Sequence, residues 1–178
     1  MTTDSKEIWI KLGYETFALK GQSELKIERL AKQVGKSKSS FYHHFADIDL
    51  FIETLLKYHI EQSYVIADKE QTANKIDPDL INVLLEHQTD LLFNRQLRIN
   101  QNVKLFNETL CCSNKIIGEA FKTVWVKDLN LKLNNKQIEG IFTLALQNFY
   151  LQINIDTLNR KWLSEYFVNL KKIANNFI

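Results

Sequence analysis

The chain is poor in the residues that interrupt helices, with one proline and five glycines among its 178 residues. A β-rich fold needs many tight turns, and turns rely mainly on these two residue types. Their scarcity leaves long uninterrupted segments. We therefore expect an all-α fold with about nine helices, as counted from apolar residues at helical spacing.

Cysteine is equally scarce, since the adjacent pair Cys111 and Cys112 are the only thiols. A disulfide between sequence neighbours is strained, and no histidine or further cysteine lies nearby at metal-ligand spacing. We expect two small, buried, apolar side chains. The alternatives are a redox switch or a metal-binding thiolate pair, but the sequence predicts neither a metal site nor a cofactor.

Long apolar runs are also absent. No segment approaches the ~20 apolar residues that cross a bilayer. The first ten residues, MTTDSKEIWI, lack the basic region and apolar stretch of a secretion signal. We expect a cytoplasmic protein that does not bind membranes. Its 45% hydrophobic and 25% charged residues are typical of a folded globular chain.

Catalytic patterns are missing as well. The chain has no glycine-rich phosphate loop, no nucleophile elbow and no H-E-x-x-H motif. Its four histidines, at positions 43, 44, 59 and 87, are scattered. The acidic pair Asp47 and Asp49 is explained by capping at the start of a helix. We therefore expect that the protein is not an enzyme.

What the chain does contain is a helix-turn-helix pattern between Ile27 and Phe45. Apolar residues recur at i, i+3, i+4 and i+7 from Ile27 to Val34, which predicts one face of a helix. Gly35 follows where a helix ends most easily in the left-handed conformation. Ser37 can then cap a second short helix, whose Phe41 and Phe45 we assign to the core.

Positive charge gathers in the same part of the chain. Residues 1–45 hold eight Lys or Arg against five acids, whereas the other 133 residues hold fifteen against sixteen. Binding to a polyanion requires such an excess where contact is made. The distribution supports a DNA-binding role for the motif.

Residues at fixed spacing in this stretch carry a family likeness: Leu30-Ala31, Gly35, Ser37, Tyr42 and Phe45. They resemble the amino-terminal DNA-binding domain of the tetracycline-repressor-like (TetR) family of bacterial regulators. Two positions depart from that family's pattern. Lys26 replaces the usual threonine and can itself bind a phosphate, whereas Ile48 replaces a lysine that tends to do so.

The second motif helix is the predicted reading element. Its first turn enters the major groove, where Lys38 can donate to guanine O6 and N7, and serines can pair with several base edges. The other candidates suit phosphate oxygens or face the DNA nearby. The full DNA-binding set is Lys26, Lys36, Ser37, Lys38, Ser39, Ser40, Tyr42, His43 and His44.

The rest of the chain is predicted to form longer helices. An Asp4–Glu7 capping box begins the first helix, and Asp47 caps a long helix that reaches residue 70. Further helices are expected over residues 79–94, 96–112, 113–129, 134–155 and 156–177, with caps at Asp79, Ser113 or Asn114, Asn134 and Asp156. We divide the chain into a DNA-binding domain at 1–46, a connecting helix at 47–70 and a regulatory and dimerisation domain at 71–178.

The last two helices carry more large apolar residues than one neighbouring helix can cover. Either they are used up inside one domain's core, or they form a self-complementary dimer surface, as the resemblance implies. The candidates for dimerisation are Ile141, Leu144, Ala145, Phe149, Trp162, Phe167 and Leu170.

The resemblance also implies a small-molecule effector bound by the carboxy-terminal helices. Apolar residues with a few polar groups are typical of such pockets, and here they favour a neutral, lipophilic ligand. The candidates are Gln88, Asn102, Phe106, Trp125 and Asn148. We expect a homodimeric, ligand-responsive regulator, most simply a repressor, on a pseudo-palindromic operator. The alternative is a helical dimer that binds a small molecule or a protein and retains only a vestigial DNA-binding head.

Overall fold

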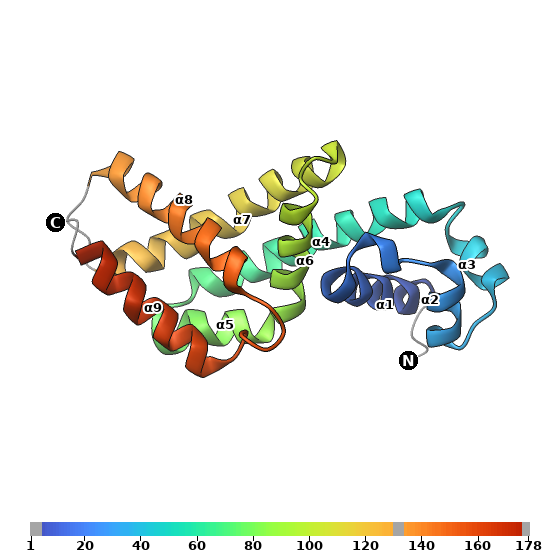
Figure 1. The fold of residues 1–178 in the computed structure, drawn as a ribbon, viewed down its shortest axis with the longest axis horizontal. Coiled ribbons are helices and arrows are strands. Elements are labelled where there is room, and N and C mark those ends of the chain that lie inside the picture. Colours follow the sequence, from blue (N-terminus) through green and yellow to red (C-terminus); the bar gives the residue numbers. More distant parts are fainter. Residues whose placement is uncertain (1–4, 130–133, 176–178) are drawn as a thin grey trace. The chain divides into compact units, whose positions relative to one another are not determined.

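The fold is all-α, as the sequence predicts. A computed structural model describes residues 5–129 and 134–175, and these contain nine α-helices and no strand (Figure 1). The Asp4 of the predicted capping box lies outside the described residues. The helices are α1 (Ser5–Lys20), α2 (Ile27–Val34), α3 (Lys38–His44), α4 (Ile48–Gln71), α5 (Ile81–Glu86), α6 (Gln88–Ile99), α7 (Lys104–Leu129), α8 (Asn135–Gln152) and α9 (Arg160–Asn175).

The chain packs as two compact units. Unit 1 consists of Met1–Gln62 and Thr89–Cys112, and unit 2 of Ser63–Gln88 and Ser113–Ile178. Helices α4 and α7 contribute residues to both units. Each unit joins segments that are distant in sequence, so the domain boundaries at residues 46 and 70 stay a prediction.

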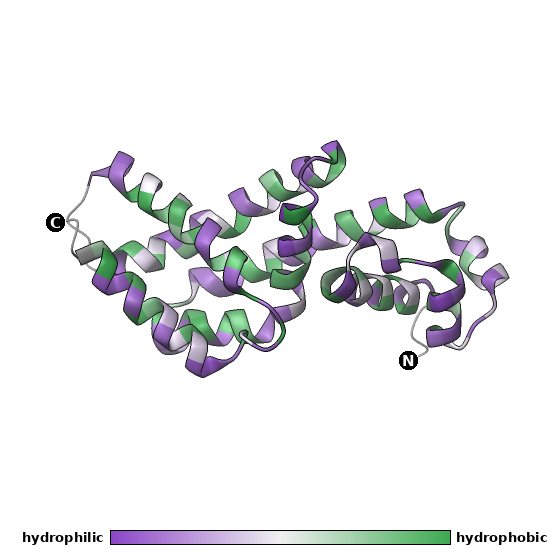
Figure 2. Cartoon of the chain, viewed as in Figure 1, coloured by the Kyte–Doolittle hydropathy of each residue, from purple (hydrophilic) through white to green (hydrophobic). Residues whose placement is uncertain are grey.

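Hydrophilic and hydrophobic residues share the helices, as Figure 2 shows. None of the helices in the described residues is both long and apolar enough to cross a bilayer. Many of their apolar positions are buried in the core of each unit.

An aromatic cluster forms the core of unit 1 beneath the motif. The Trp9 ring meets Phe41 edge-on with centroids 5.3 Å apart, and Phe51 lies 5.2 Å from Phe41 and 4.8 Å from Phe45. Phe41 and Phe45 are 0% and 2% exposed, which confirms their assignment to the core. Gly13 permits this packing, because a Cβ atom there would lie 2.3 Å from the Phe51 ring.

A buried polar group lies in the same unit and joins α1, α4 and α6. The Tyr14 hydroxyl donates to Asp90 Oδ1 at 2.7 Å and lies 2.7 Å from His59 Nδ1. Since the phenol proton goes to Asp90, the Tyr14 oxygen accepts from a protonated Nδ1 of a neutral His59. Burial lowers the pKa of His59 to about 4, with Asp90 opposing the shift. The Phe93 ring stacks on both Tyr14 and His59.

Several predicted caps are confirmed. Asp47 Oδ1 accepts from the Leu50 amide at 2.8 Å at the start of α4. Asn134 and Gln137 form the reciprocal capping box of α8, with both hydrogen bonds at 3.0 Å. Asp156 does not cap the last helix. Asn159 does so instead, accepting from the Trp162 amide at 3.0 Å.

The middle of the chain differs from the prediction. The helix expected over residues 79–94 is broken at His87 into α5 and α6, and α6 continues to Ile99. Asp79 does not cap it, because its carboxylate accepts from the Asn74 and Lys75 amides of the preceding loop. The helices expected at 96–112 and 113–129 are replaced by one helix, α7, whose interior holds the buried Ser113.

The two cysteines are exposed rather than buried, so that expectation is wrong. In the first half of α7 the buried positions are Phe106, Thr109, Leu110 and Ser113. This i, i+3, i+4, i+7 spacing defines the inner face, and Cys111 and Cys112 fall outside it.

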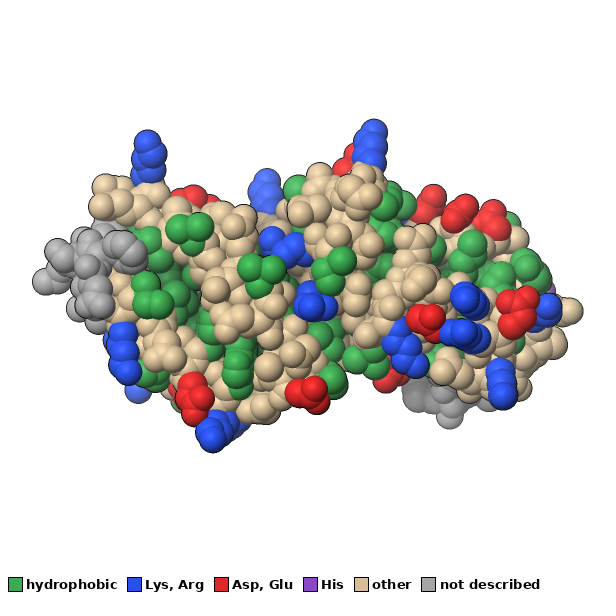
Figure 3. All heavy atoms as spheres, in the orientation of Figure 1, with side chains coloured by type: hydrophobic (Ala, Val, Ile, Leu, Met, Phe, Trp, Pro, Cys, Tyr) green, Lys and Arg blue, Asp and Glu red, His purple; other side chains and the backbone are tan. Residues whose placement is uncertain are grey.

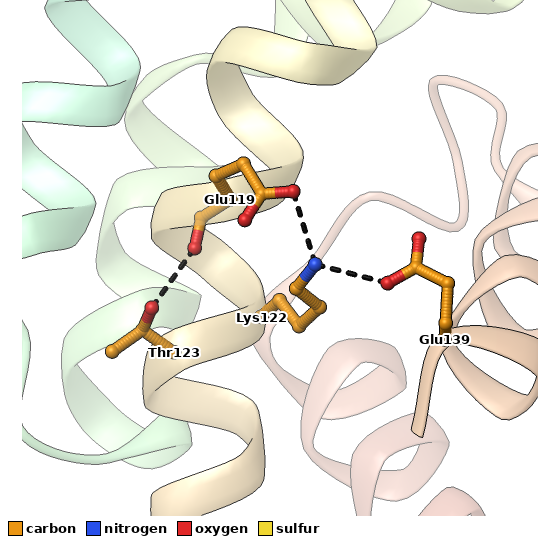
Figure 4. Close-up of polar contacts among 4 residues, drawn as sticks. All are labelled: Glu119, Lys122, Thr123 and Glu139. Carbon is orange, nitrogen blue, oxygen red and sulfur yellow. Dashed lines mark hydrogen bonds and ion pairs between the residues drawn. The ribbon is translucent and has the colours of Figure 1, made fainter. Parts of the chain in front are cut away.

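Unit 2 is held together by aromatic packing and by an ionic bridge between α7 and α8. Phe142 of α8 packs on Trp125 and Phe121 of α7 with centroids 5.6 and 6.1 Å away. Lys122 donates at 3.0 Å to both Glu119 and Glu139, one on each helix (Figure 4). The hydrogen bond to Glu119 is the largest cause that raises the pKa of Lys122, and the hydrogen bond to Glu139 is the next.

Candidate nucleic-acid interface

The turn between α2 and α3 is set by a glycine. Gly35 has φ +70° and ψ +31°, a left-handed conformation, and the Lys36 amide then donates to the Ala31 carbonyl at 3.0 Å. A Cβ at Gly35 would meet nothing within 4 Å. Glycine is therefore favoured here by backbone conformation and not by lack of space.

Ser37 begins α3 as the sequence predicts. Its hydroxyl oxygen accepts from the Ser40 amide at 3.3 Å. Leu30 and Ala31 of α2 and Phe41 of α3 are buried, so the core holds both helices in place. These buried residues therefore hold the first turn of α3 in a fixed position on unit 1.

The structure brings most of the predicted DNA-binding residues to the surface of unit 1. Those that are exposed are Lys26, Lys36, Ser37, Lys38, Ser39, Tyr42 and His43, and those that are half-buried are Ser40 and His44. Lysine and arginine side chains are interspersed with acids over the region of α1 to α3 (Figure 3). The exposed groups suit a polyanion, and the contacts themselves stay predictions.

One acid in this surface is not found by sequence reasoning. Glu28, in the first turn of α2, accepts from the Lys38 ammonium at 3.1 Å. The pKa of Glu28 lies below its ordinary value. The largest cause is a hydrogen bond from its own backbone amide, and the next is the hydrogen bond from Lys38. The two residues lie on different helices ten positions apart, so no periodicity links them. A second exposed pair, Arg29 and Glu24, lies in the same unit.

Ile48, which departs from the family pattern, has a packing role. It is half-buried at the start of α4 and lines a groove of about 590 Å³ with residues of α1, α4 and α6. Gln96 reaches the same groove and packs over Gly21, whose φ is +81°. An apolar side chain here fits a contact inside unit 1.

The predicted ligand-binding residues fall in both units. In unit 1, Phe106 is buried against Phe17, and Asn102 is exposed in the loop before α7. In unit 2, Trp125 is 1% exposed in the core, and the Gln88 amide nitrogen donates to the Leu158 carbonyl at 2.6 Å. Asn148 Oδ1 accepts from the side-chain amide of Gln152 on the surface of α8. Phe106 and Trp125 therefore act first as core residues.

The predicted dimerisation residues divide into two groups. Phe149 and Phe167 are 6% and 7% exposed, so we reassign them to the core of unit 2, which their inward-facing positions on α8 and α9 explain. Trp162 is half-buried and stacks on Tyr166 with centroids 5.2 Å apart. The others line a groove of about 550 Å³ together with Ile173: Ile141, Leu144, Ala145 and Leu170.

This groove between α8 and α9 is apolar and open. Leu144 is 68% exposed and Ile173 is 53% exposed. Hydrophobic side chains gather over this part of the surface (Figure 3). Large exposed aliphatic groups on neighbouring helices mark a surface that gains free energy when covered.

Unit 2 also contains a buried carboxyl group that no local sequence pattern indicates. Glu70 in the last turn of α4 is fully buried, and neither carboxyl oxygen has a hydrogen-bond partner. Burial alone raises the pKa of Glu70 to about 9. The group is therefore protonated and neutral at pH 7.

Residues 10–53 match the family described as bacterial regulatory proteins, tetR family. A solved structure from Mesorhizobium loti, of a protein assigned to the TetR-family transcriptional regulators, superposes with a TM-score of 0.57 at 17% identity. The match covers 98% of this chain and 96% of that one. A search of curated proteins finds no match.

Proposed function

We propose that this chain is a TetR-family DNA-binding transcriptional regulator, since residues 10–53 match that family, and that it acts as a homodimeric repressor of a pseudo-palindromic operator, released by a small effector. The observation that carries the DNA-binding part is the first turn of α3. There Ser37, Lys38 and Ser39 are exposed on a helix that buried residues hold in place. The proposal assigns base reading to Lys38 and the serines beside it.

The apolar groove between α8 and α9 supports a homodimer. A second copy would cover Leu144 and Ile173 with the same groove of its own, as two-fold symmetry requires. Two heads related by this symmetry would reach successive major grooves, with half-sites ~34–36 Å apart.

Helix α4 supports a route for the signal, because its residues belong to both units. An effector bound by unit 2 would favour one arrangement of this helix and thereby one spacing of the two heads. Only a difference in the effector's affinity for the two states can drive such a change. The predicted neutral, lipophilic effector stays part of the proposal.

The experiment is selection of preferred duplexes from random DNA by the full-length chain, followed by gel shifts over a salt series. We expect a pseudo-palindrome whose binding weakens steeply with salt. Lys38→Ala should cost about 1–3 kcal/mol and relax one base position. The matched variant Lys36→Ala should weaken binding to all sequences alike and flatten the salt dependence.

The alternative is a helical dimer that binds a small molecule or a protein with a vestigial head. The half-buried Ile48, where the family pattern has a phosphate-binding lysine, is the observation that favours it. If the chain selects no sequence and shows no salt-dependent binding to any duplex, this alternative replaces the repressor.

A further inference from the structure

The ion pair between Glu28 and Lys38 places a negative charge inside the predicted DNA-reading surface. The carboxylate and the ammonium are 3.1 Å apart, and their side chains are 70% and 56% exposed. Surface pairs of this kind contribute little to folding. Buried neighbours on each helix, Leu30 and Phe41, hold the two backbones that carry the pair.

The pair changes what Lys38 can do on DNA. A free ammonium ion is attracted to any phosphate, whatever the sequence. With Glu28 beside it, the pair carries no net charge, and the carboxylate repels phosphate oxygens that approach. The lysine therefore gains little from the DNA backbone.

The pair leaves Lys38 able to read a base. An ammonium group has three N–H donors, and one of them is directed to Glu28. Two donors remain for the O6 and N7 acceptors of one guanine. Glu28 restricts the lysine side chain to the region next to the first turn of α3, so less conformational entropy is lost when the base contact forms.

We propose that Glu28 determines the specificity of DNA binding by positioning Lys38 for base contact and by disfavouring its contact with phosphates. The inference rests on the proposed function, since it assigns a role to Glu28 at the same DNA-binding surface. Glu28 is a positioning residue, because it acts through Lys38.

The test is Glu28→Gln in the full-length chain, measured against the selected operator and against random duplex DNA over a salt series. Lys38 is then free to pair with phosphate. We expect the slope of log affinity against log salt on random DNA to steepen by about 0.9, the value of one phosphate contact. Affinity for random DNA should rise about tenfold at low salt, so the ratio of operator to random binding falls about tenfold.

The matched control is Glu7→Gln, which removes an acid of the same unit from another exposed pair, Lys11 and Glu7, at 2.6 Å. It should change the ratio less than twofold, as expected of an acid with no link to a base-reading side chain. A ratio that falls less than threefold in Glu28→Gln, or equally in both variants, overturns the inference.

A second arm repeats Glu28→Gln in a Lys38→Ala background. If Glu28 acts through Lys38, the substitution no longer lowers the ratio there. An equal fall in both backgrounds overturns the inference. The wild-type chain separates the two hypotheses: absence of operator binding rejects the proposed function, whereas wild-type binding with an unchanged ratio in Glu28→Gln rejects only the role of Glu28.

Discussion

One buried polar cluster in unit 1 and one buried carboxyl group in unit 2 differ in whether they are hydrogen-bonded. In unit 1, Tyr14, His59 and Asp90 form a hydrogen-bonded chain inside an aromatic core. In unit 2, the carboxyl of Glu70 is fully buried with no hydrogen-bond partner for either oxygen. Paired buried groups define one packing, whereas an unpartnered group carries a desolvation cost.

The units also differ in their apolar surfaces. The aromatic residues in the core of unit 1, such as Phe41 and Phe51, are covered by that unit itself. Unit 2 leaves Leu144 and Ile173 exposed along a groove. Unit 1 also exposes apolar side chains, such as Ile99 at 57%, so what distinguishes unit 2 is that Leu144 and Ile173 line one apolar groove.

Glu70 gives the largest expected effect. Its pKa is about 9 in the fold against 4.5 as the ordinary value, so the folded state binds more protons between these values and stability falls as pH rises. The expected loss is about 1.4 kcal/mol per pH unit. Glu70→Gln should abolish this slope. The measurement is chemical unfolding of both proteins between pH 6.5 and 8.5.

The pH window is chosen because His59 acts on the other side. Its pKa is lowered to about 4 from 6.5, so His59 removes stability only as pH falls below 6.5. Above pH 6.5 His59 no longer changes the stability with pH, so the measured slope reports on Glu70. A wild-type slope equal to that of Glu70→Gln would show that the carboxyl is solvated or paired, and the contrast between the units would disappear.

Asp90→Ala should break the paired chain of unit 1. The Tyr14 hydroxyl then loses its acceptor in a buried site, which costs about 2–3 kcal/mol of unfolding free energy. Tyr14→Phe is the matched variant. It removes the hydroxyl and keeps the ring stacked on Phe93, but also leaves Asp90 without that donor. Urea unfolding at pH 7 measures both. Losses below about 0.5 kcal/mol would mean that the chain does not stabilise unit 1.

Leu144→Glu gives the smallest effect on the fold and a large one on assembly. Leu144 is 68% exposed, so its substitution should change the unfolding of the single chain by less than about 0.5 kcal/mol. A charge in a covered apolar interface should convert dimers to monomers, as measured by light scattering at several concentrations. Leu151→Glu, at a site that is 78% exposed and outside the groove lining, is the control. Unchanged mass would argue against the groove as the dimer surface.

Helix ends were predicted correctly where a short segment of sequence determines them. Gly35, Ser37 and Asp47 act on residues no more than five positions away, and each ends or begins a helix as expected. The break at His87 and the continuity of α7 were not predictable in this way. Ser113 resembles a cap, but its burial inside unit 2 favours a continuous helix.

At the candidate site, too, local features were predictable from the sequence and contacts between helices were not. The exposed first turn of α3 follows from spacing, since Phe41 and Phe45 mark the inner face and leave Lys38 outside. Glu28 could not be found, because its contact with Lys38 joins two helices across the turn. The burial of Phe149 and Phe167 within unit 2 could not be predicted, because the apolar pattern is the same whether a residue is covered by its own chain or by a second copy.

The sequence by itself determined the helical class and the helix-turn-helix, whose residues 10–53 match the tetR family, because these depend on periodicity, caps and a glycine at fixed spacing. Tertiary structure alone decided which polar groups are paired. Tyr14 meets Asp90 across 76 positions, while Glu70 is buried with both carboxyl oxygens unpartnered. The physical reason is that desolvation and hydrogen bonding depend on neighbours in space, and no local pattern records them.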